Sequence, residues 1–352
     1  MGRKSKARRG NDADASRTAG GEKKEVLLKS VGKNQGYGYY AGAGACAAVI
    51  ALFVAFWSGD AGQRHVVTDS DVSDLSLGAR SEFGGLTLPA SELEAPWEDS
   101  VKCISGSYPE TVTGCSPFDT CKRKVVDNFV GAEDLSTLLS MVRRGMAASP
   151  ATGGPTIMDI NSGFLYDNQG LVNIYESHRG HEPIAFSAEE FEVYGALFDK
   201  VREHVISVHG LSDLWFTAPT FVTRLVGNSS WKPKTAHDMY WAPHVDKDNT
   251  GHYDYSGLVY LSTHGEDFTG GEFKFYEDDD FTDPKGRAIT VLPRSRRLIT
   301  FSSGKENFHQ VKPVVSGERF TFSMWFSCNK TMEFKTFLDG KRHDKYNDPT
   351  AA

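Results

Sequence analysis

A mainly β fold of the antiparallel barrel or jelly-roll class, preceded by a single transmembrane helix, is predicted by three features of this 352-residue sequence. Short strand-like segments follow one another from residue 217 onward, with turn residues between them. A stretch of 26 residues without a charge lies near the N-terminus. Four cysteines follow that stretch, an even number that suits disulfides in an oxidising compartment.

The composition is that of a globular protein. Hydrophobic residues make up 39% of the chain, charged residues make up 24%, and the net charge is -7. A nucleic-acid-binding protein normally presents a basic face, so we expect no nucleic-acid partner. The length allows one large core or two modest ones.

The first 59 residues have the pattern of a signal anchor. Residues 1–33 contain ten lysines and arginines against four acidic residues, whereas residues 34–59 contain no charge. At ~1.5 Å per residue, this stretch can cross a hydrocarbon core of ~30 Å, and basic segments stay on the cytoplasmic side. We expect a basic cytoplasmic tail, a single-pass type II anchor, and a lumenal remainder in the endoplasmic reticulum or Golgi. The alternatives are a cleaved signal peptide, for which the basic leader is long, a buried helix of a soluble protein, which rarely stays uncharged for so long, and a nuclear signal in the basic segment.

Two regions separate the anchor from the β region. Residues 60–100 hold two basic and nine acidic residues and few large apolar ones, which predicts a flexible acidic stem. Residues 101–216 are expected to form a cysteine-rich, loop-rich segment followed by helical support. Helical spacing is present over 132–146 and 188–208. Ser187 and Glu190 form a capping box before the second helix, and Gly210 ends it.

The cysteines and two asparagines agree with a lumenal domain. The sequons Asn228-Ser-Ser and Asn329-Lys-Thr are candidate glycosylation sites. Two disulfides are expected, with three pairings open among Cys103, Cys115, Cys121 and Cys328.

Residues 217–330 are expected to form the β core, and residues 331–352 a polar tail. The core contains seven strand-like segments, which read TFVTRLV, SGLVYLS, GGEFKFYE, AITVLP, RRLITFSS, FHQVKPV and RFTFSMWFS. Consecutive strands with short turns between them favour antiparallel pairing.

Half of a metal site is suggested by His244-Val-Asp246. Residues two apart on a strand point the same way, so the imidazole and the carboxylate would lie together. They would supply two members of the 2-His-1-carboxylate triad that binds non-heme Fe(II). Such triplets also arise by chance as surface turns, and His252-Tyr-Asp254 is a second one.

Downstream residues favour the metal interpretation. His309 begins a predicted strand and could supply the third ligand. Arg319 lies on the next, very apolar strand, where a buried cation needs an anionic partner. A dicarboxylate co-substrate would be one, since guanidinium binds carboxylate through two hydrogen bonds, and Tyr260 could donate another. The alternative for Arg319 is a structural salt bridge with Glu318 or Glu306.

The segments HVD, LVYLS, FTGGEFKFYE, RRLITFSSGKENFHQVKPV and GERFTFSMWF together resemble the prolyl 4-hydroxylase-type Fe(II)/2-oxoglutarate dioxygenases. The resemblance covers roughly residues 100–329 and is densest from 217 onward. It implies a double-stranded β-helix (jelly roll) with supporting helices, and iron ligation by His244, Asp246 and His309.

The resemblance also implies the roles of other residues. Arg319 matches the basic residue that binds the distal carboxylate of 2-oxoglutarate, and Tyr260 matches the tyrosine that assists it. Trp325 matches a tryptophan of the substrate pocket, which Tyr240 and Trp241 could also line. Many prolyl hydroxylases have lysine where Arg319 stands, so this residue does not identify the substrate.

The chemistry that the resemblance implies uses Fe(II), O2 and 2-oxoglutarate, with L-ascorbate restoring oxidised iron. Decarboxylation of 2-oxoglutarate to succinate and CO2 is coupled to hydroxylation of a C–H bond. The expected substrate is a prolyl or other residue of a lumenal protein or peptide.

Two other classes of protein remain open. One is a catalytically inactive jelly roll that binds a lumenal partner. The other is a type II Golgi glycosyltransferase with Asp278-Asp-Asp280 as a metal motif. The glycosyltransferase predicts alternating βαβ units, which the consecutive strands disfavour.

Overall fold

The computed structural model describes residues 85–104, 106–108, 112–115, 121–234, 238–277 and 287–334. All of these lie within one of two compact units, Ala41–Ala352. The predictions for the basic tail, the anchor, the first part of the stem, the Asp278–Asp280 motif and the tail beyond 334 concern residues outside these ranges. In the described part of the chain, no helix has the length and apolar character of a membrane span.

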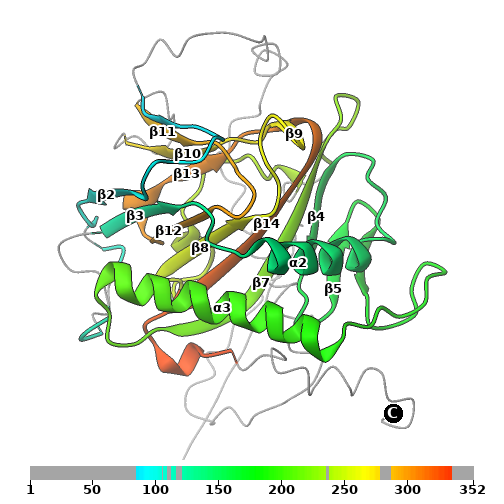
Figure 1. The fold of residues 1–352 in the computed structure, drawn as a ribbon, viewed down its shortest axis with the longest axis horizontal. Helices are drawn as coiled ribbons and strands as arrows, with labels where there is room; N and C mark the ends of the chain where they lie inside the picture. Colours follow the sequence, from blue (N-terminus) through cyan, green and yellow to red (C-terminus); the bar gives the residue numbers. More distant parts are fainter. Residues whose placement is uncertain are drawn as a thin grey trace, which may run out of the picture. The chain divides into compact units, whose positions relative to one another are not determined.

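Two β-sheets form the framework (Figure 1). The smaller sheet has the order β1-β11-β10-β13, with β1 (Thr87–Leu88), β10 (Phe273–Tyr276), β11 (Ala288–Val291) and β13 (His309–Val311). The larger sheet has the order β2-β3-β12-β8-β14-β7-β4-β5-β6, and β9 pairs with β14. In chain order its strands are β2 (Trp97–Val101), β3 (Cys121–Val126), β4 (Gly154–Met158), β5 (Phe164–Asp167), β6 (Gly170–Asn173), β7 (Trp215–Gly227), β8 (Tyr255–Tyr260), β9 (Phe268–Gly270), β12 (Leu298–Ser302) and β14 (Val314–Ser327).

The strand pairing agrees with the predicted jelly roll. Among the described strands, every pair is antiparallel except the short β1–β11 contact. From β7 to β14 the strands follow one another, with the short helix α4 (Asp246–Asn249) and the 3-10 helix η3 (Lys305–Asn307) among them. Alternating βαβ units are not found in this described region, so the glycosyltransferase interpretation has no support from the fold.

Helices α2 (Ala132–Gly145) and α3 (Ala188–His209) lie on the same side of the larger sheet (Figure 1). The predicted start and end of the long helix are confirmed. Ser187 Oγ accepts a hydrogen bond from Glu190 N, and Glu190 Oε2 accepts one from Ser187 N at 2.8 Å. The helix ends at Gly210, whose φ of 64° favours glycine.

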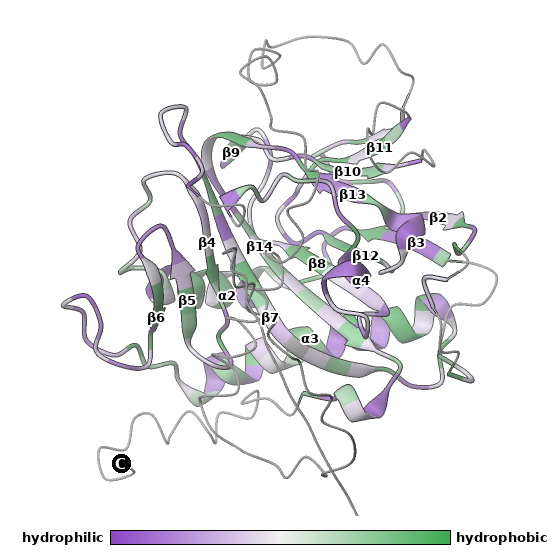
Figure 2. Ribbon diagram, turned by 180° about the vertical axis from the view of Figure 1, so that it is seen from behind, coloured by the Kyte–Doolittle hydropathy of each residue, from purple (hydrophilic) through white to green (hydrophobic). Residues whose placement is uncertain are grey.

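The long strand β14 separates two layers of side chains, and its mixed hydropathy can be followed in Figure 2. Phe320, Phe322, Met324 and Phe326 belong to the core beneath the helices. Because strand side chains alternate, Arg319 and Thr321 point to the other face of the larger sheet. There Tyr260, the register partner of Thr321, packs in a cluster with Phe273 and Phe275 of the smaller sheet.

The predicted stem boundary at residue 100 is wrong, because residues 85–100 belong to the folded unit. Strand β2 pairs with β3 throughout its length. Arg297, whose side chain is fully buried, donates hydrogen bonds to Asp127 and to the carbonyls of Pro89 and Ser91. Glu98 forms ion pairs with basic residues of β3. Composition alone predicted a stem here, because the basic partners of these acidic residues lie far away in the sequence.

The core is also wider than the predicted 217–330. Strands β2 to β6 join the same sheet as β7 and β14. The cysteine-rich segment contains β3 as well as loops, and of its two disulfides one closes a loop within the segment and the other connects it to the end of β14. One joins Cys103 to Cys121 and the other joins Cys115 to Cys328, which selects one of the three possible pairings.

Candidate metal centre

The smaller sheet places His309 in the interior. His309 is the first residue of β13 and the register partner of Phe275 on β10, so the two side chains share a face. Phe273 stacks on the imidazole with 5.1 Å between ring centroids. His309 Nδ1 lies 2.8 Å from the carbonyl oxygen of Asn307, which sets the rotation of the ring.

His244 is held beside His309 by backbone pairing. His244 N donates to His309 O at 2.9 Å, and His309 N donates to His244 O at 3.0 Å. The two ring centroids are 4.3 Å apart. His244 Nδ1 lies 2.9 Å from the carbonyl oxygen of Ala242. Backbone pairing with β13 therefore orients His244, and this tertiary contact matters more than the local conformation of its own segment.

Asp246 differs from the sequence prediction in its local structure. It is the first residue of helix α4, so it does not continue a strand from His244. Its Oδ1 nevertheless lies 3.5 Å from His244 Nε2 and 3.7 Å from His309 Nε2. Its Oδ2 accepts a hydrogen bond of 2.6 Å from Ser256 Oγ, which also contacts Ser303 Oγ. One carboxylate oxygen is therefore fixed, and the other faces the two imidazoles.

His244, Asp246 and His309 place one ligand atom each within 4.8 Å of one another. Both Nδ1 atoms face backbone carbonyls, which selects the tautomer whose Nε2 can bind a metal. This donor set of two imidazole nitrogens and one carboxylate oxygen fits Fe(II). The predicted ligands are therefore brought together by the fold.

The charges in the cluster are suited to a cation. Burial lowers the pKa of His309 to about 4, so this imidazole is neutral at neutral pH, as metal binding requires. Burial alone would raise the pKa of Asp246, but the neighbouring histidines hold it well below its usual value. Burial also opposes protonation of His244, whereas the contact with Asp246 raises the pKa of that imidazole overall.

The second triplet has a structural role. Asp254 accepts a hydrogen bond of 2.7 Å from the buried Lys247 Nζ, and another of 2.7 Å from Cys328 N. His252 Nε2 lies 3.1 Å from Thr217 Oγ1. The alternative interpretation of such a triplet as a surface turn does not apply to Asp254, which neutralises a buried cation.

Arg319 forms the core of a candidate anion site. Its side chain is 3% exposed, yet Nη1 donates to Thr321 Oγ1 and Nε has no partner among the described residues. The guanidinium carbon lies 5.1 Å from the centroid of the Tyr260 ring. Burial raises the pKa of Tyr260, so its hydroxyl stays protonated and can donate. Apart from Arg319, that hydroxyl has no hydrogen-bond partner among the described residues.

A structural salt bridge does not account for Arg319. Among the described residues, no carboxylate lies within ion-pairing distance of its guanidinium. Glu306 instead accepts hydrogen bonds from Tyr108 and Ser302. Since an unpaired buried cation is costly, the geometry fits an anionic ligand. Tyr260 lies four residues along β8 from Ser256, or about 13 Å, on the same face of the strand.

The aromatic residues named for the pocket lie around these groups. Trp325 is the register partner of Ser256 and stacks on Tyr253 at 5.0 Å between centroids. Tyr240 and Trp241 contact each other edge to face, and the Tyr240 hydroxyl accepts a hydrogen bond from Val314 N. Ser256 and Asn307, which orient two ligands, were not predicted. Serine and asparagine are common near turns, so no local signal marks them.

Comparison with known proteins agrees with this site. Residues 234–327 match the 2OG-Fe(II) oxygenase superfamily. The 2OG-Fe(II) oxygenase domain is therefore the class of domain that this part of the chain matches. The match contains all three ligands together with Arg319 and Tyr260.

Two named relatives extend the comparison. The chain is 37% identical over 218 residues to 2-oxoglutarate and iron-dependent oxygenase domain-containing protein 3 of Homo sapiens, covering 61% of this chain and 65% of that protein. It therefore spans slightly less than two thirds of that relative. Prolyl 3-hydroxylase 2 of Rattus norvegicus is 36% identical over 102 residues, which is 26% of this chain and 14% of that protein.

Among solved structures, a prolyl hydroxylase of Trichoplax adhaerens in complex with a hypoxia inducible factor peptide covers 58% of this chain and 83% of its own. The identity is 18% and the TM-score is 0.39.

Proposed function

We propose that the chain is an Fe(II)- and 2-oxoglutarate-dependent dioxygenase that hydroxylates a residue of a protein or peptide. The observation that carries the proposal is the buried convergence of His244, Asp246 and His309, with Nδ1 or Oδ2 of each held by a neighbouring group. Retention of this set has no evident structural use, which disfavours an inactive binding module.

The roles of the residues follow from their positions. The three ligands would hold Fe(II), which when bound supplies oxygen activation coupled to conversion of 2-oxoglutarate into succinate and CO2. Arg319 and the Tyr260 hydroxyl would bind the distal carboxylate, because both have unused donors. Phe273 and Trp325 are buried beside the ligands or their partners and exclude water.

The substrate and location form the finer part of the proposal. A prolyl residue is the preferred substrate because of the sequence resemblance and the named relative prolyl 3-hydroxylase 2. Residues 34–59 would anchor the protein as a single-pass type II membrane protein, with the catalytic domain in the lumen of the endoplasmic reticulum or Golgi. Two disulfides support an oxidising compartment. L-ascorbate would serve as the reductant that keeps the metal ferrous.

The experiment compares Asp246→Asn with Asp254→Asn, two buried carboxylates that each lose one charge. We expect Asp246→Asn to abolish Fe(II) binding and succinate release, because two imidazoles alone hold Fe(II) loosely. Asp254→Asn should keep metal affinity but lower the free energy of unfolding by about 3 kcal/mol, because Lys247 is left unpaired. Metal titration, 2-oxoglutarate turnover and urea unfolding are measured for both.

Metal and 2-oxoglutarate binding by the wild-type protein distinguishes the dioxygenase from an inactive jelly roll. With Fe(II) and 2-oxoglutarate under anaerobic conditions, it should develop a visible charge-transfer band. A wild-type protein that binds neither would leave only the inactive jelly roll. Loss of metal binding in Asp254→Asn with retention in Asp246→Asn would show that the other triplet is the ligand set.

A further inference from the structure

The turn that precedes His309 is built on side chains from the cysteine-rich segment. This turn contains the 3-10 helix η3 (Lys305–Asn307). The carbonyl oxygen of Asn307 contacts His309 Nδ1 at 2.8 Å. The position of the Asn307 backbone therefore sets the orientation of the imidazole.

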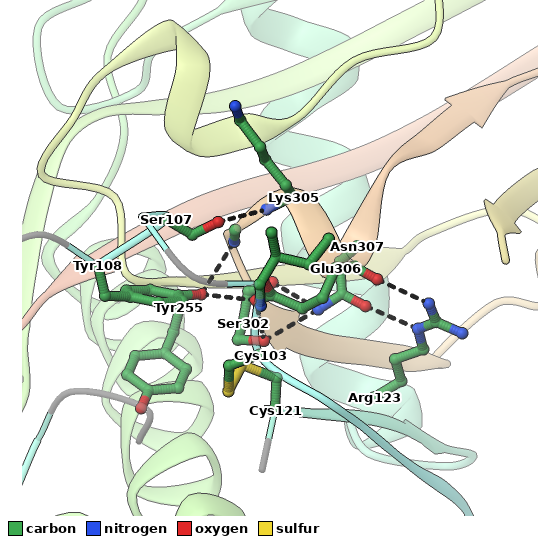
Figure 3. Close-up of a disulfide and its surroundings, with 12 residues drawn as sticks. Cys103, Ser107, Tyr108, Cys121, Arg123, Tyr255, Ser302, Lys305, Glu306 and Asn307 are labelled. Carbon is green, nitrogen blue, oxygen red and sulfur yellow. Dashed lines mark hydrogen bonds between the residues drawn. A yellow bond between two sulfur atoms is a disulfide. The ribbon is translucent and has the colours of Figure 1, made fainter. Parts of the chain in front are cut away.

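Arg123 of β3 holds this turn through two donors at once (Figure 3). Its Nε donates to Asn307 Oδ1 at 2.6 Å, and its Nη2 donates to the carbonyl oxygen of Glu306 at 2.9 Å. The third arm, Nη1, lies 3.3 Å from Asp99 Oδ2 on β2. The side chain is 2% exposed, and the guanidinium carbon lies 4.6 Å from the centroid of the Phe275 ring. Phe275 is itself the register partner of His309.

A second group of contacts comes from the loop that the Cys103–Cys121 disulfide closes. Tyr108 Oη accepts a hydrogen bond from Gly304 N and donates to Glu306 Oε1 at 2.8 Å. Ser107 Oγ accepts a hydrogen bond from Lys305 N. A Cβ at Gly304 would lie 2.5 Å from Glu306 Oε2 and 2.8 Å from Tyr108 Oη, so glycine permits this close approach.

The disulfide connects these contacts to Arg123. Cys121 begins β3, and Arg123 follows two residues later on the same face of the strand. The closed loop and the arginine therefore approach the same turn from one short stretch of chain. Since His309 Nδ1 contacts the carbonyl oxygen of Asn307, the placement of this turn affects the orientation of the His309 ring.

We infer that Arg123 is a positioning residue for the metal ligand His309, acting through Asn307. The inference rests on the proposed function, because it assigns a role in a metal site. Arg123 touches no ligand and no substrate. It fixes the turn from which the imidazole projects, and a lysine cannot replace its planar fork of donors.

The test measures metal affinity, with Co(II) as the probe and its visible absorption as the readout. Arg123→Lys should weaken Co(II) binding about 10-fold, the lower end of the range for groups that orient metal ligands. The matched control is Arg297→Lys, which alters an equally buried arginine whose partners lie outside the metal turn. This control should unfold more easily and still bind Co(II) like the wild type.

The milder variant Asp99→Ala can still test the inference if Arg123→Lys does not fold. Asp99 is 31% exposed in its side chain and contacts only the third arm of the guanidinium. Asp99→Ala should fold and weaken Co(II) binding roughly twofold to fivefold, within the effect of losing one outer hydrogen bond. Wild-type affinity in Asp99→Ala and Arg123→Lys, or an equal loss in Arg297→Lys, would overturn the inference. A wild-type protein that binds no metal would instead overturn the proposed function.

Discussion

At the residue scale, the buried cations near the site differ in the carboxylate partners that the fold gives them. Arg297 and Lys247 are buried cations with carboxylate partners, Asp127 and Asp254. Arg319 is equally buried but has no such partner among the described residues. A cation that the fold leaves unpaired is the expected mark of an anion-binding site.

This contrast predicts opposite effects on stability and binding. Arg319→Met should leave the free energy of unfolding without ligand unchanged or higher, because no carboxylate loses its partner. It should weaken 2-oxoglutarate binding by roughly 100-fold, since hydrogen bonds to a charged group contribute about 1.5–3 kcal/mol each. Urea unfolding and titration of the Fe(II)-loaded protein with 2-oxoglutarate measure the two quantities.

Arg297→Met is the control for that prediction. It strands the buried Asp127, so it should cost about 3–5 kcal/mol of stability. Destabilisation of Arg319→Met by a similar amount, with unchanged 2-oxoglutarate affinity, would assign Arg319 a structural role.

At the element scale, the disulfides and helix α3 secure the framework behind the site. The Cys103–Cys121 bond closes 18 residues beside the turn of His309, whereas Cys115–Cys328 links positions 213 apart and ties the end of β14 to the N-terminal segment. Helix α3 ends at His209, whose ring contacts Tyr255 at 4.6 Å between centroids. The Cys115–Cys328 disulfide and Tyr255 belong to the core on the helix side of the larger sheet, whereas Cys121 shares a face of β3 with Arg123.

The two disulfides should contribute unequally to stability. In the chain-entropy description, loss of the 18-residue link costs about 3 kcal/mol and loss of the 213-residue link about 5 kcal/mol. Paired cysteine-to-serine variants at 103/121 and at 115/328, compared by urea unfolding, measure this difference. A larger loss from the shorter link would show that native contacts outweigh the loop entropy.

Burial of His209 at the end of helix α3 predicts that the protein loses stability as the pH is lowered. Burial lowers the pKa of His209 from 6.5 to about 3. Between these values the unfolded chain binds a proton that the folded protein does not, so stability falls as pH is lowered through this window. After allowance for partial exposure, His209→Phe should recover about 1 kcal/mol at pH 5 relative to pH 7.5. The exposed His181→Phe serves as the control, and an equal recovery there would contradict the assignment.

At the scale of the whole molecule, the structure describes the candidate metal site, whereas the membrane topology is predicted from the N-terminal sequence. The described residues form the two sheets and place the ligands between them. The orientation of the protein at a membrane is a prediction from the charge distribution of residues 1–33 and the uncharged stretch 34–59.

That orientation predicts the outcome of two assays on the full-length protein. Glycosidase treatment should increase gel mobility through loss of glycans at Asn228 or Asn329, and the double Asn→Gln variant should show no shift. Protease added to sealed microsomes should remove only the N-terminal tail. Digestion of the disulfide-containing domain in intact microsomes would reverse the topology.

Local patterns in the sequence identify the regular elements of this protein. Periodic apolar residues identified α3 and its capping box, strand-like segments between turn residues identified β7, β8 and β10 to β14, and the resemblance to the prolyl 4-hydroxylase-type dioxygenases singled out His244, Asp246 and His309. Local backbone geometry links the residues of one helix or strand, so neighbouring positions contain the information that specifies each element.

Features that join distant positions are seen only in the folded protein. These include the pairing of Cys115 with Cys328, the inclusion of residues 85–100, and the neutralisation of Lys247 by Asp254. Arg123 reads as an ordinary surface charge until β3 is placed beside the turn of His309, 186 positions away. The physical reason is that buried polar groups need hydrogen-bond or ion-pair partners, and the packing of the sheets determines which residues are close enough to serve. The separation of two residues in the sequence does not predict this proximity.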